Sequence, residues 1–488
     1  MANILFTHSY FYRFDEKQWA MKQPYPPYGT LYAAAKMREE GHHVALFDTN
    51  LVVSPVEIKP ILKSEQPDYL VIYDDGFNYL TKMCLTNMRE AAFELIKFGK
   101  ENACKVIVSS SDSTDHPDFY LEKGADFILL GEGEETLSEL VTAIESGQQD
   151  MSSILGICYH SETFVKNPRR PVIRNLDSLP DPAWDLVDID MYRKVWMEGN
   201  GYFSLNIATT RGCPFKCNWC AKPIYGNRYN SRSPERVANE IEMLVSKFGA
   251  RHFWFSDDIF GLKPGWVQSF RDIVKAKNLQ FSYKIQSRVD LLLQEDTIAA
   301  LAQSGLKTVW VGAESGSQKI LDAMDKGTKI EQIYEATELL KRKGVEVGFF
   351  LQFGYLGETR EDISSTIQMV LDCMPDDIGI SVSYPLPGTK FFEMVKAQLD
   401  DKQNWSHSDD LAMMYKGTFS PDFYRRLHRF VHKTFRKHQG FANLKGILMN
   451  PTAVNRSKLR SALATVYYIP AAAIDNYKLR LLEKQSVS

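Results

Sequence analysis

Two long stretches of the chain alternate short apolar segments with helix-like segments, and this alternation limits the fold more than any other feature. The first stretch covers residues 1–150, with helical patterns at 31–42 and 86–100. Parallel strands need a long crossover connection, which is usually a helix. Residues 1–150 are therefore predicted to form a doubly wound, Rossmann-like α/β domain. Its strand candidates are ILFT (4–7), VALF (44–47), YLVIY (69–73), KVIVS (105–109) and DFILL (126–130).

The second stretch covers residues 203–383 and contains six strand candidates. Between them, residues 233–249 carry the boundary signals of a helix, with Ser233 as N-cap, Pro234 in the first turn and Gly249 at the end. Six strand–helix units predict an incomplete parallel barrel, a partial (β/α)6 barrel, with its chemistry at the carboxyl ends of the strands. The strand candidates are 203–210, 251–256, 281–286, 307–312, 345–352 and 377–383.

The remaining segments are a connector and a tail. Residues 151–200 show little periodicity and include NPRRPVIRNLDSLPDPAWD, whose four prolines favour an extended segment. The chain from about residue 401 onward is helical and basic. The predicted organisation is a Rossmann-like domain at 1–150, a connector at 151–200, a barrel at 201–400 and a helical C-terminal region at 401–488.

The composition limits the class of protein. A formal net charge of −3 provides no general attraction to nucleic acid. The first residues lack the regions of a signal peptide, and no stretch is long enough to span a membrane. Cys84, Cys104, Cys158 and Cys373 are scattered, which does not favour a disulfide framework. A cytoplasmic protein is predicted.

Small and polar residues follow the predicted strands of the first stretch. In a doubly wound sheet the ligand crevice lies beyond the carboxyl ends of the strands. No GxGxxG motif follows the first strand, so a dinucleotide is not the favoured ligand. The segments at this edge are HSYFYRF (8–14), DDGFN (74–78), SSSDSTD (109–115) and GEGEE (131–135).

Three of the seven cysteines follow the first barrel strand within eight positions. Cys213, Cys217 and Cys220 form the pattern CxxxCxxC at the expected active end of the barrel. A structural zinc site needs four ligands, and no second cysteine pair is present, although a catalytic zinc site with three protein ligands remains an alternative. Three thiolates in one short loop favour a [4Fe–4S] cluster that keeps one iron open for an external ligand.

The stretch TTRGCPFKCNWC resembles the signature of radical S-adenosylmethionine (SAM) enzymes, and the similarity covers roughly residues 1–400. The N-terminal part is similar to the cobalamin-binding subclass of that family. The stretches that carry the resemblance are PYPPYGTLYAAAKMREEGHHVALFD (24–48), DFILLGEGEETLSEL (126–140), LDSLPDPAWDLVD (176–188), FWFSDDIFG (253–261), IQSRVDLL (285–292), VGAESGSQKILDAMDKGT (311–328), GFFLQFGYLGETRED (348–362) and YPLPGT (384–389).

The resemblance implies that the three thiolates bind three irons and that SAM chelates the fourth. An electron from an external donor would then cleave SAM to a 5'-deoxyadenosyl radical. Asp257 and Asp258 stand where the family commonly has a Gly-Gly-Glu-like stretch that contacts the methionyl amine; the alternative is an acidic turn. No residue is assigned a catalytic role. The candidate SAM-binding residues are Trp219, Asp257, Asp258, Arg288, Glu314 and Gln352.

The same resemblance places cobalamin on the N-terminal domain, with the corrin facing the barrel mouth. The DxHxxG pattern of domains that bind cobalt through histidine is absent, so no protein histidine is expected on cobalt. The GEGEE stretch is also explained as an ordinary helix start with acidic residues near the dipole. The candidate cobalamin contacts are Tyr10, Asp75, Ser109, Ser110, Ser111, Gly131, Glu132, Gly133 and Glu134.

The C-terminal region differs from the rest of the chain in charge. Residues 421–488 contain 13 lysines and arginines and 3 acidic residues, a net charge of +10, which leaves −13 for the remainder. Residues 458–484 also mix apolar residues with basic flanks. A solvated helix surface is the simpler interpretation. Contact with an anionic membrane or a cover over the active site is the alternative, and it would favour a lipid-like or anionic substrate.

The leading hypothesis is a cobalamin-dependent radical SAM enzyme that methylates an unactivated carbon through methylcobalamin. A rival with the same cofactors carries out cyclisation, ring contraction or rearrangement without methyl transfer. Rivals from other classes are a non-catalytic cofactor carrier and a zinc hydrolase. The sequence does not identify the substrate.

Overall fold

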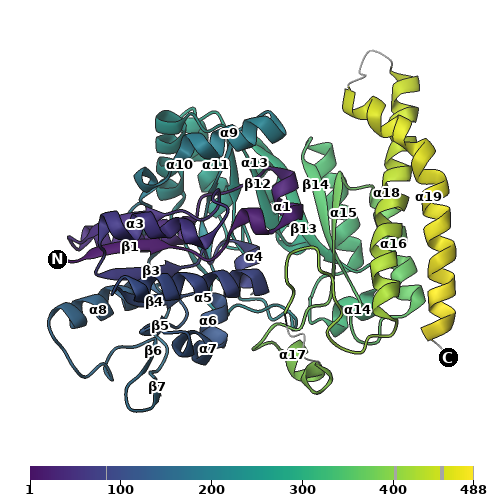
Figure 1. The fold of residues 1–488 in the computed structure, drawn as a ribbon. Helices are drawn as coiled ribbons and strands as arrows, with labels where there is room; N and C mark the ends of the chain where they lie inside the picture. The colour runs from purple at the N-terminus through teal and green to yellow at the C-terminus, as the bar shows by residue number, and fades with distance from the viewer. Residues whose placement is uncertain (84, 400–403, 451–455, 487–488) are drawn as a thin grey trace.

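The computed structural model describes residues 1–488 except 84, 400–403, 451–455 and 487–488, so Cys84 lies outside the described residues. The N-terminal domain is built on a seven-stranded sheet with the order β2-β1-β3-β4-β5-β6-β7 (Figure 1). The first five strands are parallel, which confirms the Rossmann-like prediction. They are β1 (Asn3–Thr7), β2 (His43–Phe47), β3 (Tyr69–Tyr73), β4 (Lys105–Ser109) and β5 (Phe127–Leu129).

Helices cover both faces of this sheet, and the central strands are apolar for that reason. All five residues of β3 are buried, as expected of a parallel strand covered on both faces. The helices of this domain are α1 (Glu16–Met21), α2 (Tyr28–Glu39), α3 (Ile58–Glu65), α4 (Tyr79–Lys82), α5 (Thr86–Glu101), α6 (Ser111–Asp115), α7 (Pro117–Glu122) and α8 (Glu134–Glu145).

The segment 151–200 contains more structure than the sequence predicted. Strands β6 (Ile157–His160) and β7 (Phe164–Lys166) extend the N-terminal sheet in antiparallel fashion. Helix α9 (Ile189–Asn200) then leads to the second domain. The two strands are short, and β7 is largely exposed, so they lack the apolar pattern by which strands are recognised in a sequence.

The second domain is built on a six-stranded parallel sheet with the order β15-β14-β13-β12-β11-β8. Strands β15 and β8 are its two edges, which confirms the incomplete barrel. A short antiparallel pair, β9 (Thr210–Arg211) and β10 (Asn230–Ser231), lies at its mouth. The barrel strands are β8 (Ser204–Ile207), β11 (His252–Phe255), β12 (Ser282–Ser287), β13 (Leu306–Glu314), β14 (Glu346–Phe353) and β15 (Asp377–Val382).

Helix α10 (Pro234–Phe248) begins and ends where the sequence predicted. The Ser233 side chain accepts a hydrogen bond from the Arg236 amide at 3.1 Å, and Gly249 ends the helix with a positive φ of 63°. The other barrel helices are α11 (Trp266–Ala276), α12 (Val289–Leu292), α13 (Thr297–Gln303), α14 (Gln318–Ala323), α15 (Ile330–Arg342), α16 (Arg360–Cys373) and α17 (Lys390–Val395).

The C-terminal region is an antiparallel helical hairpin of α18 (Pro421–Met449) and α19 (Arg456–Ser486) at the edge of the barrel (Figure 1). The buried Asp475 of α19 accepts hydrogen bonds from Arg426 and Lys433 of α18, both at 2.7 Å. No helix among the described residues is apolar over a length that would cross a bilayer.

The two domains share one hydrophobic core. Tyr10, Tyr28, Tyr32 and Phe77 of the N-terminal domain belong to the same buried cluster as the barrel residues around Phe255. The carboxyl ends of the first sheet are therefore held against the barrel by apolar burial as well as by polar contacts.

We expect Asp475→Asn to loosen the hairpin, because it leaves two cations without their anionic acceptor. Hydrogen bonds to charged groups contribute about 1.5–3 kcal/mol, so protection of the α18 and α19 amides should fall accordingly. Hydrogen exchange read by mass spectrometry measures the change. Asp422→Asn, which alters an exposed pair with Arg425, is the matched control and should leave exchange unchanged. Equal protection in both variants would contradict the assigned role of Asp475.

Candidate functional site: the cysteine loop between two domains

The three cysteines lie on a loop whose two ends are tied together. Strands β9 and β10 pair Arg211 with Asn230 at the base of the loop. Gly212 begins the loop with a φ of +79°, and a Cβ at this position would approach the Arg228 carbonyl oxygen to 2.3 Å. Glycine is therefore required at the first residue of the loop.

Asn218, between the second and third cysteines, fixes the far side of the loop. Its side-chain amide donates to the Ala323 carbonyl at 2.7 Å, and its side-chain oxygen accepts from the Tyr355 hydroxyl at 2.9 Å. Its backbone amide and carbonyl bond to Met324 and Phe391 at 3.0 and 2.9 Å. The spacing of the motif did not reveal this residue, because its partners lie more than a hundred positions away.

The donor set fits an iron–sulfur cluster. Cys213, Cys217 and Cys220 are free, partly exposed thiols on one short loop. Among the described residues, no three His, Cys, Asp or Glu side chains converge on a position for a single metal ion. In a cluster each thiolate binds a different iron, so such convergence is not needed. Burial raises the pKa of Cys220 to about 12, so iron would bind here in exchange for a proton.

The two acidic residues after β11 have different surroundings. Asp257 is buried and accepts four hydrogen bonds, from the backbone amides and the hydroxyls of Thr209 and Thr210, at 2.6 to 2.9 Å. Burial raises its pKa to about 6 even so. Asp257 thus supports the strand that leads to the cysteine loop. Asp258 is less buried and forms an ion pair with Lys82 of the N-terminal domain.

Arg288 and Glu314 are buried at the barrel mouth and linked through Lys326. The Arg288 guanidinium lies 3.8 Å from the Phe215 ring centroid and 4.0 Å from the Cys217 sulfur, and it donates to the Lys326 carbonyl at 2.8 Å. The Lys326 ammonium donates to Glu314 at 2.7 Å. Glu314 also has an unusual φ of +56°. Two cations therefore stand beside the cysteine loop.

Trp219 and Gln352 complete the residues predicted for SAM. The Trp219 ring packs on a cluster that includes Tyr355 and Phe391, and its buried indole nitrogen has no acceptor among the described residues. A buried donor without a partner fits a ligand group. Gln352 is buried and donates to the Ser383 hydroxyl at 2.8 Å, which ties β14 to the end of β15.

The predicted cobalamin edge is polar and buried, but many of its groups bond within the protein. The Asp75 carboxylate accepts from the Gly29 and Phe77 amides, both at 3.0 Å. Ser109 ends β4, Ser110 caps helix α6 and Ser111 begins it, all of them buried. The buried Tyr10 hydroxyl has no partner in the described part of the chain, so it fits a polar group of a ligand.

The two histidines at this edge, His8 and His116, contact other residues of the protein. His8 is buried, and its ring nitrogens lie 2.9 Å from the Thr49 hydroxyl and 3.0 Å from the Asp48 carboxylate. His116 is half-buried and stacks on Phe119. A cobalt-binding role is therefore not assigned to either residue.

The GEGEE stretch contacts the cysteine loop directly. Arg211, two residues before the first cysteine, donates to Glu132 at 2.6 Å and to Glu134 at 2.7 Å, and all three side chains are at most 5% exposed. A Cβ on Gly131 would lie 3.2 Å from the Ile224 carbonyl, and one on Gly133 only 2.8 Å from the Tyr73 ring. Glu132 and Glu134 therefore stabilise the contact between the two domains.

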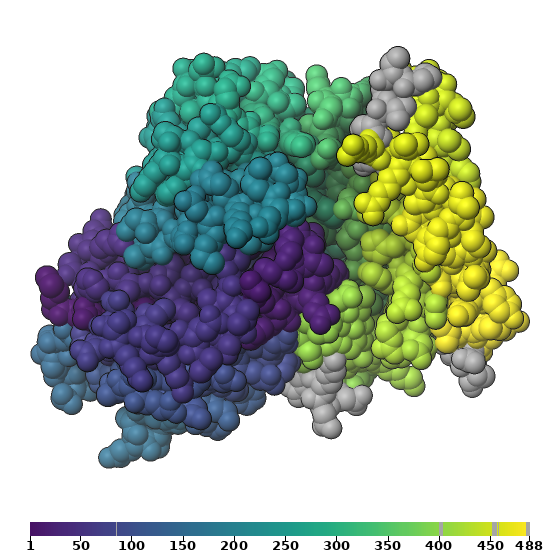
Figure 2. Space-filling view, turned by 45° about the horizontal axis from the view of Figure 1, so that its top comes forward, coloured from purple at the N-terminus to yellow at the C-terminus, as the bar shows by residue number. Residues whose placement is uncertain are grey.

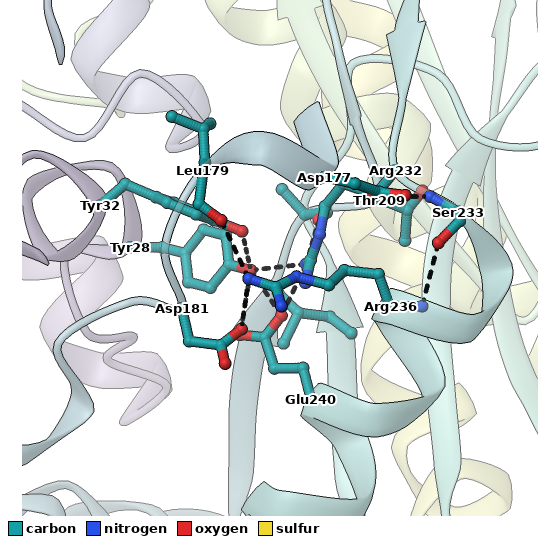
Figure 3. A network of polar contacts seen from close by, with 12 residues as sticks. Tyr28, Tyr32, Asp177, Leu179, Asp181, Thr209, Arg232, Ser233, Arg236 and Glu240 are labelled. Atoms are coloured by element: carbon teal, nitrogen blue, oxygen red, sulfur yellow. Dashed lines mark hydrogen bonds and ion pairs between the residues drawn. The ribbon is translucent and has the colours of Figure 1, made fainter. Parts of the chain in front are cut away.

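A second buried ion pair lies within the barrel and hydrogen-bonds to a tyrosine of the N-terminal domain (Figure 3). Arg232, after β10, donates to Glu240 of α10 at 2.6 Å and to the Tyr28 hydroxyl of α2 at 3.0 Å. Tyr28 and the indole of Trp184 both donate to Glu240. Figure 3 shows Arg236 beside this network, pointing toward the connector, where it pairs with Asp181 at 3.0 Å.

Two residues of α4 lie near the barrel mouth and were not predicted. Lys82 reaches across to Asp258. Tyr79 begins the same short helix, and desolvation raises its pKa, with smaller contributions from the charges of Cys220 and Glu314. Segment 79–82 of the N-terminal domain therefore faces the cysteine loop. Sequence spacing cannot reveal such residues, since their neighbours belong to another domain.

Comparison with known proteins agrees with this geometry. Residues 207–370 match the family model of the radical SAM superfamily. An uncharacterised methyltransferase of Pyrococcus horikoshii is 31% identical over 379 residues, which are 75% of this chain and 78% of that protein. An anaerobic magnesium-protoporphyrin IX monomethyl ester cyclase of Rubrivivax gelatinosus is 30% identical over 284 residues, 57% of this chain and 49% of that protein.

The fold is also found among solved structures. The cobalamin-dependent SAM radical enzyme OxsB, with aqua-cobalamin bound, superposes with a TM-score of 0.74 at 16% identity and covers 98% of this chain and 72% of that one. The chain belongs to the radical SAM superfamily. It is a radical SAM enzyme whose N-terminal domain and barrel have the architecture of the cobalamin-dependent members.

We expect Arg211→Gln to destabilise the protein strongly, because it leaves two carboxylates buried without their cation. Breaking one side of a buried pair costs about 3–5 kcal/mol. Urea unfolding measures the free energy, with Arg38→Gln, an exposed pair with Asp185, as the matched control at about 0–1 kcal/mol. Burial already raises the pKa of Glu132, so the defect should shrink as pH falls and this carboxyl becomes neutral. Equal losses in the two variants would contradict the role of Arg211.

Proposed function

We propose that the protein is a cobalamin-dependent radical SAM methyltransferase that methylates an unactivated carbon. The observation that carries this proposal is the direct contact between the cysteine loop and the ligand edge of the N-terminal sheet. Arg211 binds Glu132 and Glu134, and Gly131 packs against Ile224 at the end of the same loop. A cofactor bound to the barrel and a cofactor bound to the N-terminal domain would therefore act on the same substrate.

The residues at the barrel mouth have distinct proposed tasks. Cys213, Cys217 and Cys220 would hold three irons, while Arg288 and Lys326 offset the negative charge of the thiolates. Asp258, Glu314 and Trp219 offer two carboxylates and an indole donor to polar groups of SAM. When bound, the cofactors supply the radical that removes hydrogen from the substrate and the methyl group that replaces it.

The N-terminal domain is proposed to hold cobalamin without a histidine on cobalt. Tyr10 offers a hydroxyl that has no partner among the described residues, and Ser111 begins helix α6 at the same edge of the sheet. Both His8 ring nitrogens contact Asp48 or Thr49, so this histidine is held inside the domain. The protein is proposed to act on a small-molecule or lipid-like substrate and to receive its electron from an external donor.

The name of the relative from Rubrivivax gelatinosus supports a second candidate function, a cyclisation with the same cofactors. The first-named relative, from Pyrococcus horikoshii, is called a methyltransferase and matches over a larger share of both chains, so methyl transfer is preferred. A non-catalytic cofactor carrier predicts no turnover of SAM at all.

Loss of one cluster ligand should abolish the cleavage of SAM. We expect the reduced, reconstituted protein to form 5'-deoxyadenosine and Cys217→Ala to form none, because the cluster would lose an iron ligand. Chromatography of the quenched reaction measures the product. Cys373→Ala, which removes a buried thiol at the end of α16, is the matched control and should retain activity. If the wild-type protein forms no 5'-deoxyadenosine, the carrier hypothesis is favoured.

Labelled SAM distinguishes methylation from cyclisation. With SAM labelled in its methyl group, we expect the label in the product, because the methyl group would pass through cobalamin to carbon. Mass spectrometry of the product measures the transfer. An unlabelled product that forms together with 5'-deoxyadenosine would reject methylation and support the cyclase alternative.

A further inference from the structure

The C-terminal hairpin carries nearly half of the exposed large apolar residues of the described chain. Of the 25 large apolar residues that are exposed in the described chain, 12 lie between Phe441 and Leu481. Leu463 and Val466 of α19 are 66% and 76% exposed. Single exposed apolar residues are ordinary, whereas a contiguous group marks an interaction site. The hairpin stands on the barrel side of the molecule, away from the N-terminal domain (Figures 1 and 2).

Helix α19 is apolar on two opposite sides. Its inner side, with Ala472 and Leu479, is buried. Its outer side carries apolar residues at intervals of four, three, eight, three and four positions, which keep them on one face of a helix with 3.6 residues per turn. The stripe extends over about 33 Å at 1.5 Å per residue. Its residues are Leu459, Leu463, Val466, Ile474, Tyr477 and Leu481, each at least 44% exposed.

The charges of the hairpin are sorted between the same two sides. Asp475 is buried against α18, and Glu483 pairs with Arg360 of α16 at 3.6 Å, so both acidic residues of α19 face the protein. Arg460, Lys478 and Arg480 are exposed, flank the apolar stripe and form no ion pair with any residue that the structure describes. The outer side is therefore an apolar stripe with basic borders.

We propose that this outer side of α19, with the adjoining tip of α18 at Phe441–Met449, binds the surface of an anionic lipid bilayer. The stripe would enter the boundary between headgroups and acyl chains, with the helix parallel to the surface. The basic side chains would reach the lipid phosphates, since long cationic side chains extend along apolar surface to polar groups. This inference does not depend on the chemistry proposed for the cysteine loop.

The charge of the hairpin favours a bilayer over a second copy of this chain. A symmetric dimer through the same face would bring together two C-terminal segments of net charge +10 each. Like charges oppose such a contact, whereas an anionic membrane attracts each basic residue with about 1 kcal/mol. The apolar stripe and its basic borders are therefore more complementary to an anionic lipid surface than to the same face of a second copy of the chain.

Flotation of the full-length protein with vesicles tests the proposal. We expect binding to vesicles of phosphatidylcholine mixed with phosphatidylglycerol, weaker binding at high salt, and little binding to phosphatidylcholine alone.

The triple variant Arg460→Gln, Lys478→Gln, Arg480→Gln should lose about a hundredfold in partitioning to the anionic vesicles. Leu463→Glu, Val466→Glu, Tyr477→Glu should abolish binding.

A matched control places three glutamates on exposed apolar positions elsewhere. Met191→Glu, Met197→Glu, Met394→Glu changes residues that are 48–50% exposed and should bind vesicles like the wild type. Equal loss in this control, or equal binding to neutral and anionic vesicles, would overturn the proposal. Light scattering adds a further outcome: a wild-type dimer that the α19 glutamate variant dissociates would make this face a self-association surface and reject the membrane.

Discussion

The contact on which the rest of the structure depends is the buried ion pair of Arg211 with Glu132 and Glu134. Arg211 leads into the cysteine loop, and the two glutamates lie at the edge of the N-terminal sheet. An unsatisfied charge in this position would be costly, so the three side chains, together with the shared hydrophobic core, hold the two domains in one relative orientation. The position of the loop, and with it the position of any cluster, follows from that orientation.

The regular parts of the fold could be predicted from the sequence because their signals are local. A buried parallel strand such as β3 is a continuous apolar run, and helix α10 carries its own N-cap and terminal glycine. The three cysteines were likewise visible as a spacing. Their order along the chain, strand then loop, was sufficient to place them at the barrel mouth.

The contacts around the cysteines could not be predicted, because they join distant segments. Asn218 was passed over although it lies inside the motif, since its partners are in α14 and beyond β14. Lys82 and Tyr79 reach the site from another domain. For Asp257 the sequence indicated a position after β11 but not the surrounding groups. Its hydrogen bonds to Thr209 and Thr210 show that it supports the strand that leads to the cysteine loop, whereas Asp258 is the residue proposed to contact SAM. The short strands β6 and β7 are not evident in the sequence because four and three residues are too few to show a strand pattern.

The pairing of β9 with β10 has a consequence for how the metal centre is assembled. The ladder closes a loop of 18 residues, 212–229, by backbone pairing between its two ends. Closing a flexible loop of this length costs roughly 2.5 kcal/mol of chain entropy, by the logarithmic dependence on length. Because the pairing of β9 with β10 meets that cost, the binding of iron does not have to supply it. The three thiols are thus presented on a loop whose ends the fold itself holds together, so cluster assembly is expected to load this loop rather than to fold it.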